Sequence, residues 1–144
     1  MNAKVNFKIA VLLKEVGYNL IYHDSSFYNG NYPDSIPLNY YITQENYSSN
    51  TEQFAYYYVA PTIAQAVMWI YEKHGIWISV YTMEKWHENG NEMIQYFDYT
   101  IKQMKLGLID FPKKMEEFNS PTEAYLAAIE NILKNFEKNL EFTK

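Results

Sequence analysis

Apolar residues recur at helical spacing in the first and middle parts of the chain. Within Val5–Val16 the apolar side chains fall three or four positions apart, lysines lie between them, and Gly17 follows as a stop signal. In the middle, Thr62 and Gln65 have the spacing of a capping box, and the broad apolar face that follows ends at Gly75. These two patterns predict an N-terminal helix and a capped central helix.

The pattern then changes from helical spacing to alternation. Ile76–Met83 alternates along an aromatic and β-branched stretch, Glu84–Glu92 is polar and contains an Asn-Gly turn signal, and Met93–Met104 resembles a returning strand. Helical spacing resumes after Ser120, the expected N-cap, and the apolar stripe continues to Leu140. The second half is therefore predicted to be a β-hairpin followed by a C-terminal helix.

Periodicity is weak in residues 18–55, where Tyr, Asn, Ser and Pro dominate. Short strands at Asn19–His23 and Leu38–Thr43 are predicted there as a hairpin around an Asn-Gly turn. Tyr47–Gln53 is interpreted as an exposed loop, and Tyr56–Val59 as a short aromatic strand.

The predicted fold class is α+β, in which the helices pack on one face of a small antiparallel sheet. Residues 1–144 are expected to form a single domain, because this is the length of one ordinary domain. Apolar residues make up 48% of the chain and charged residues only 20%, so the chain can bury enough apolar surface to fold.

Composition also restricts the chemistry. Without cysteine there is no disulfide, thiolate nucleophile or sulfur-ligated zinc, and no phosphate-binding glycine motif occurs, so no cofactor is expected. The net charge is −5 and no arginine is present, which disfavours nucleic acid as a partner. No stretch approaches the roughly 20 apolar residues of a membrane helix, and the N-terminus lacks the features of a signal peptide. We therefore expect a cytoplasmic protein without a membrane partner.

Three segments carry a family resemblance: IAVLLKEVGYN, VAPTIAQAVMWIYEKHGIWISV and EEFNSPTEAYLAAIENIL. Together they resemble a family of small uncharacterised proteins of Bacteroides-type gut bacteria and their phages or prophages. The resemblance implies a helix, an aromatic segment, a capped helix, a β-hairpin and a last helix. It implies an origin in a phage or mobile element, and it brings no activity or catalytic residue with it.

Aromatic residues are the one compositional surplus, at 18% of the chain. If the isoleucines of the predicted hairpin face the helices, aromatic side chains must lie on its outer face. Such a face can be covered by the chain's own Tyr-rich segment, which we favour, can receive a second protomer, or can stack bases. The candidate binding residues are Trp77, Tyr81, Trp86 and Tyr96.

The leading hypothesis is a non-enzymatic accessory protein that acts through protein–protein contacts, either self-association as a homodimer or binding to a host partner. One alternative is a small metal-dependent hydrolase that uses His74 or His87 with nearby carboxylates. Another is a nucleic-acid-binding module, because the order helix, hairpin, helix resembles that of a double-stranded-RNA-binding domain.

Overall fold

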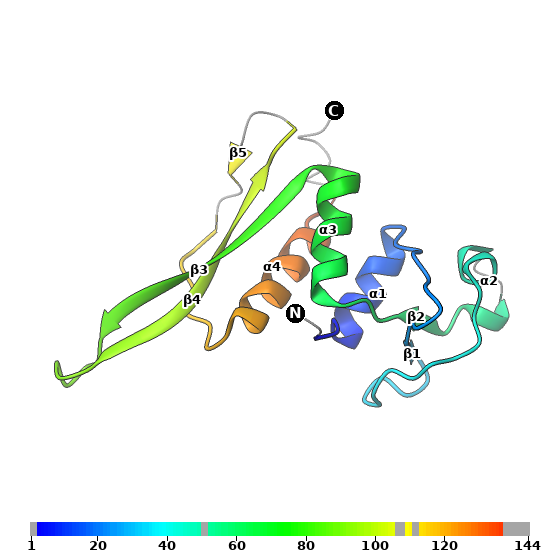
Figure 1. Cartoon of the computed structure of the whole chain (residues 1–144), viewed down its shortest axis with the longest axis horizontal. Helices are drawn as coiled ribbons and strands as arrows, with labels where there is room; N and C mark the ends of the chain where they lie inside the picture. The colour runs from blue at the N-terminus through cyan, green and yellow to red at the C-terminus, as the bar shows by residue number, and fades with distance from the viewer. Residues whose placement is uncertain (1–2, 50–51, 106–108, 111–112, 137–144) are drawn as a thin grey trace. The chain divides into compact units, whose positions relative to one another are not determined.

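The computed structural model describes residues 3–49, 52–105, 109–110 and 113–136, and it confirms the α+β class (Figure 1). Helices are combined with two small antiparallel sheets, ordered β1-β2 and β3-β4-β5. The chain divides into two compact units, Met1–Ala66 and Val67–Lys144, which are described separately below. The single domain over residues 1–144 stays a prediction.

The first unit begins with the predicted helix, observed as α1 (Phe7–Glu15). The Asn6 side chain accepts a hydrogen bond from the Ile9 N–H and caps the helix, so the helix starts two residues later than the apolar pattern does. Val5 precedes the cap and donates its N–H to the Pro61 carbonyl at 3.0 Å. The buried face of α1 then contributes to the core of this unit.

The predicted hairpin between Asn19–His23 and Leu38–Thr43 is wrong. β1 (Phe27–Asn29) instead pairs antiparallel with β2 (Tyr57–Val59), and Leu38 meets Phe27 only in an isolated bridge. The Asn-Gly turn does follow β1, but prolines at positions 33 and 37 come soon after it. Proline has no N–H to donate to a strand ladder, so no returning strand forms there. The strand predicted at Tyr56–Val59 is confirmed as β2.

The predicted exposed loop at Tyr47–Gln53 is wrong as a loop and wrong about Tyr47, whereas the exposure is confirmed for Ser48, Ser49, Glu52 and Gln53. Two short helices occupy this stretch, α2 (Gln44–Ser49) and the 3₁₀ helix η1 (Glu52–Phe54), and residues 50–51 lie outside the described residues. Tyr47 is buried, with 2% of its surface exposed, and its hydroxyl accepts a hydrogen bond from the Val59 N–H at 3.0 Å. A buried backbone donor therefore explains why this tyrosine turns inward.

The central helix α3 (Ile63–His74) has the predicted capping box. The Thr62 hydroxyl accepts from the Gln65 N–H, and the Gln65 side chain accepts from the Thr62 N–H. Gly75 ends the helix with φ +68°, the left-handed conformation that glycine adopts without strain.

In the second unit, β3 (Ile76–Trp86) and β4 (Met93–Gln103) form the predicted hairpin, with a turn shorter than expected. β5 (Ile109–Asp110) pairs with the end of β4. α4 (Pro121–Lys134) begins at Ser120, which caps the Glu123 N–H as predicted. α4 packs against β3 and β4 through its buried residues, and the predicted continuation to Leu140 lies outside the described residues.

Candidate functional site

The register of the hairpin decides which face each aromatic side chain occupies. Ile76 and Ile78 are buried on the side of the sheet that α4 covers, and Trp77 and Tyr81 alternate with them on the outer side. Tyr96 pairs with Met83 and therefore shares this outer side. Three of the four predicted binding residues thus lie on one face of the hairpin.

Their exposure differs widely. Trp77 is 36% exposed and contacts the ring of Tyr71 edge to face, with ring centroids 5.3 Å apart. Tyr81 is half-buried, and Tyr96 is only 9% exposed. Of these three outer residues, Trp77 therefore offers the largest accessible aromatic surface.

The grouping of Trp86 with Trp77 on one face needs correction. An odd number of positions separates the two residues in β3, so they lie on opposite sides of the sheet. Trp86 pairs with Met93 near the hairpin turn, and they are 65% and 48% exposed. The hairpin extends beyond α4 at this end (Figure 1), and Thr82, Glu84 and Gln95 on the same side of the sheet are exposed as well.

The connector, defined here as residues 113–118, lies along the edge of β4 that does not face β3. Phe118 and Phe97 exchange two backbone hydrogen bonds of 2.9 Å, and β5 occupies the same edge farther along. Lys85 on the outer face forms an ion pair with Glu117 at 2.7 Å. Within this unit the connector therefore supplies part of the cover that the outer face of the hairpin requires.

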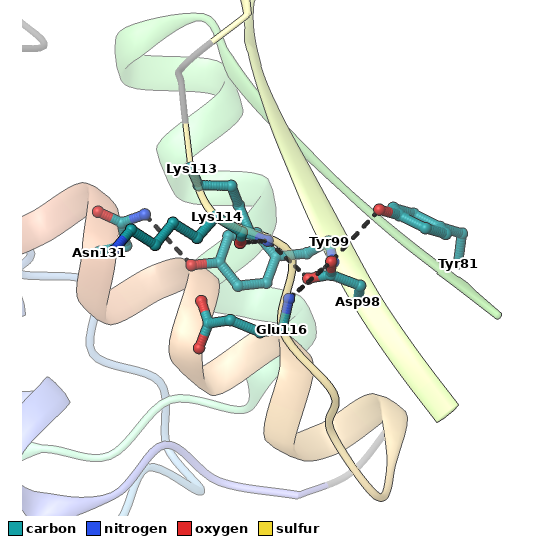
Figure 2. Close-up of polar contacts among 7 residues, drawn as sticks. All are labelled: Tyr81, Asp98, Tyr99, Lys113, Lys114, Glu116 and Asn131. Carbon is teal, nitrogen blue, oxygen red and sulfur yellow. Dashed lines mark hydrogen bonds and ion pairs between the residues drawn. The ribbon is translucent and has the colours of Figure 1, made fainter. Parts of the chain in front are cut away.

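Asp98, on the outer face of β4, holds the connector in place (Figure 2). Its side chain accepts hydrogen bonds from the Lys113 ammonium at 2.7 Å, the Glu116 N–H at 3.1 Å and the Tyr99 N–H at 2.8 Å. The Tyr81 hydroxyl approaches the same carboxylate at 3.4 Å. Because Asp98 is fully buried, each of these donors offsets part of the cost of desolvating its charge.

The same network reaches α4. The Lys113 ammonium lies 4.5 Å from the centre of the Tyr99 ring, and the Tyr99 hydroxyl accepts a hydrogen bond from the Asn131 side chain at 3.2 Å. Figure 2 shows these side chains converging from β4, the connector and α4. We call Asp98, Lys113 and the Glu116 N–H the latch.

The electrostatics of the latch favour structure over catalysis. Burial alone would raise the pKa of Asp98, but hydrogen bonds from Lys113, Glu116 and Tyr99 and the Lys113 charge outweigh it, so the pKa lies below its ordinary value. Burial, followed by the charge of Asp98, raises the pKa of Tyr81. A carboxylate with a lowered pKa is a weak base, and a tyrosine with a raised pKa is a weak acid.

The histidines proposed for a hydrolase do not assemble a metal site in the described part of the chain, where no group of three or more His, Asp or Glu side chains could hold an ion. His74 packs instead between the rings of Trp69 and Phe136, at centroid distances of 5.3 and 4.4 Å. Its Nε2 is buried and has no hydrogen-bond partner among the described residues. Burial, with the charges of Lys105 and Lys73, lowers the pKa of His74.

The lowered pKa of His74 predicts a loss of stability in mild acid. The unfolded chain takes up this proton at the ordinary pKa of about 6.5, before the folded chain does, so protonation favours unfolding as the pH falls below that value. We expect His74→Phe, which keeps a ring between Trp69 and Phe136, to remove this part of the pH dependence. Chemical denaturation of both proteins between pH 8 and pH 5 measures it. Equal slopes for the two proteins would contradict the assignment to His74.

A cavity of about 420 Å³ in the first unit was not predicted from the sequence. Residues 21–23, 25 and 39–44 line most of it, and Tyr22, His23 and Tyr41 are among them. No carboxylate or ammonium group is among its described lining residues. The predicted hairpin strands Asn19–His23 and Leu38–Thr43 coincide with most of these two segments, so the sequence pattern indicates that they meet. It does not indicate that they meet without a strand ladder and leave a cavity between them.

Comparisons with protein-family models, with curated proteins and with solved structures gave no match. Among the helices of the described ranges, none is long and apolar enough to cross a membrane. Inferences about function therefore rest on the geometry of the chain itself.

Proposed function

We propose that this chain is a non-enzymatic accessory protein that acts through protein–protein contacts made by its β3–β4 hairpin. The family resemblance described above is the basis for assigning it to a phage or mobile element. The observation that carries the proposal is the edge of β3 that points away from β4. Among the described residues, no backbone group pairs with this edge. An unpaired strand edge is a template for pairing with another chain.

Hydrogen bonds at the two ends of the hairpin identify the groups at this edge. The Met104 N–H donates to the Gly75 carbonyl at 2.8 Å, and the His87 N–H donates to the Glu92 carbonyl at 2.7 Å. In an antiparallel pair, hydrogen-bonded positions recur every second residue, so the odd-numbered residues of β3 bond to β4. The even-numbered residues Ile78, Val80, Thr82 and Glu84 therefore direct their N–H and C=O groups toward the open edge.

From Ile76 to Met83 the side chains of β3 do not protect this edge, and charged residues enter the strand only at Glu84 and Lys85, near the turn. Proteins commonly protect an edge strand with charged residues, proline or a bulge, or keep the strand short. β3 has 11 residues, and its pairing with β4 runs without a bulge from Ile76 to Trp86. No charged residue or proline occurs from Ile76 to Met83. The two exposed tryptophans, Trp77 and Trp86, lie at opposite ends of the strand and add apolar surface beside it.

The other candidate functions have weaker support. A hydrolase needs a nucleophile, base or metal group within reach of one another, and the latch and the three histidines do not provide one in the described residues. A nucleic-acid partner needs a basic surface, and the net charge of −5 opposes it. Protein contact through a strand edge requires neither a catalytic group nor a basic surface.

Photo-crosslinking at the edge tests the proposal. A crosslinking amino acid replaces Thr82, at the centre of the open edge, and in a matched control it replaces Lys114, an exposed residue of the connector. We expect the chain with the crosslinker at position 82 to form a crosslinked complex in the cell that produces it. Wild-type chain without the crosslinker should reduce the yield of this complex by competition, whereas a Thr82→Pro variant should not. Absence of crosslinked protein from position 82, or equal yields from both positions, would refute contact through this edge.

A further inference from the structure

We infer that the partner of the β3 edge is the β3 edge of a second copy of this chain, paired antiparallel about a two-fold axis. This inference rests on the proposed function, because it names the partner for the same edge. It is carried by the distribution of charge along the hairpin, which differs between its two ends.

One end of the hairpin, here called the base, is basic. Lys102 pairs with Trp77 of β3 on one side and with Asp110 of β5 on the other. Lys73 and Lys105 lie near the start of β3, where the charges of both lower the pKa of His74. Glu72 is the acidic residue next to this group in sequence. The base therefore has three lysines and two acidic residues, Glu72 and Asp110.

The other end, here called the tip, is acidic. Glu84, Glu88 and Glu92 lie in or beside the turn and are exposed. The one lysine near them, Lys85, is already ion-paired with Glu117 of the connector. An isolated tip therefore carries carboxylates without matching cations on its own strands.

Antiparallel pairing of two such edges matches these charges twice. The two-fold axis places the tip of each copy beside the base of the other, so carboxylates approach lysines at both ends of the interface. Parallel pairing would instead place tip beside tip and base beside base. Opposite charges across an interface favour one orientation and disfavour the other.

A register centred on Tyr81 uses the whole strand. It pairs Ile76 of one copy with Trp86 of the other, so that the open even-numbered positions of both strands form the hydrogen-bonded pairs. It places Trp77 opposite Lys85 of the second copy, so the two side chains are cross-strand neighbours on the same face. Both exposed tryptophans of β3 therefore gain a partner, which the isolated chain does not provide for Trp86.

Charge reversal provides the decisive experiment. The tip-reversed variant replaces the three tip glutamates by lysine, and the base-reversed variant replaces the three base lysines by glutamate: Glu84→Lys, Glu88→Lys and Glu92→Lys in one, and Lys73→Glu, Lys102→Glu and Lys105→Glu in the other. Each variant alone repels its own copy at both ends, whereas an equimolar mixture restores both attractions. Light scattering and sedimentation measure association, and circular dichroism checks that each variant is folded.

We expect a wild-type dimer that weakens with added salt, at least about tenfold weaker self-association for each reversed variant, and a heterodimer in the mixture. Thr82→Pro, which removes an outward N–H, should also dissociate the dimer. A wild-type chain that stays monomeric up to high micromolar concentration would overturn the inference, and so would a dimer that none of these variants weakens.

The two proposals can fail separately. A crosslink from position 82 to a different protein, with a monomeric purified chain, would refute the second copy as partner and leave the proposed function standing. Absence of any crosslinked protein from position 82 would refute both proposals.

Discussion

Replacement of Asp98 by asparagine is expected to lower the free energy of unfolding of the second unit by about 3–5 kcal/mol, the usual cost of removing one partner from a buried ion pair. The carboxylate accepts hydrogen bonds from Lys113 and from the Glu116 N–H, and the side chain of Lys113 is itself only 12% exposed. The variant leaves an ammonium group without its counter-charge beside the sheet. Urea denaturation followed by circular dichroism measures the loss.

The double variant Asp98→Asn with Lys113→Met is the matched control. Removing the stranded charge should recover part of the loss, because an apolar side chain tolerates this site better than an unpaired ammonium does. If Lys113→Met lowers the free energy of unfolding by the same amount in Asp98→Asn as in the wild type, the two residues do not interact as described.

The latch also predicts a specific response to acid. The pKa of Asp98 is lowered in the folded protein, whereas in the unfolded chain it is about 3.9. The stabilisation by the charged carboxylate is therefore complete above about pH 4 and is lost as the pH falls through the folded pKa. The difference in stability between wild type and Asp98→Asn should narrow in this acidic range and stay constant between pH 5 and pH 8.

Replacement of Tyr47 by alanine is expected to cost about 3–5 kcal/mol of unfolding free energy in the first unit, the range for truncating a buried aromatic residue. The ring contacts Phe27 at a centroid distance of 5.9 Å, and the Lys14 ammonium lies 4.6 Å from its centre. The Lys14 ammonium also donates to the Tyr57 carbonyl of β2 at 2.9 Å. The alanine variant therefore removes a ring around which α1, α2 and β2 meet.

Tyr47→Phe separates the hydroxyl group from the ring. The phenylalanine keeps the packing and leaves the buried Val59 N–H without its acceptor, at an expected cost of about 1–3 kcal/mol. Thermal and urea denaturation of both variants give the two contributions. A phenylalanine variant as stable as the wild type would show that the hydroxyl group contributes nothing to stability.

The elements that the sequence predicted well are those whose signals are local. The capping residues Thr62 and Ser120 act on N–H groups within one turn of themselves, so their helices begin where the pattern indicates. Alternation in β3 likewise needs only neighbouring residues. The helices and the hairpin could therefore be located from the sequence without knowledge of their partners.

Two residues were hard to interpret because distant segments set their environment. Tyr47 looks like a loop residue among polar neighbours, and it is buried because Val59 and Lys14 approach it from far along the chain. Asp98 looks like a polar residue on a strand, and its role depends on Lys113 and Glu116 in a connector without periodicity. Trp86 could have been placed correctly by counting positions from Trp77, because alternation already separates the two faces.

The two edges of the larger sheet are unequal, and this difference limits how far assembly can proceed. The sheet ends in β3 on one side and in the two-residue strand β5 and the connector on the other, so among the described residues β3 is the one long strand at an edge. A sheet with one free edge stops growing after a single pairing, whereas a sheet with two free edges can polymerise without end. If copies pair as we infer, the buried carboxylate of Asp98, which holds the connector against β4, limits assembly to a dimer, and we expect its loss to expose β4 to further copies.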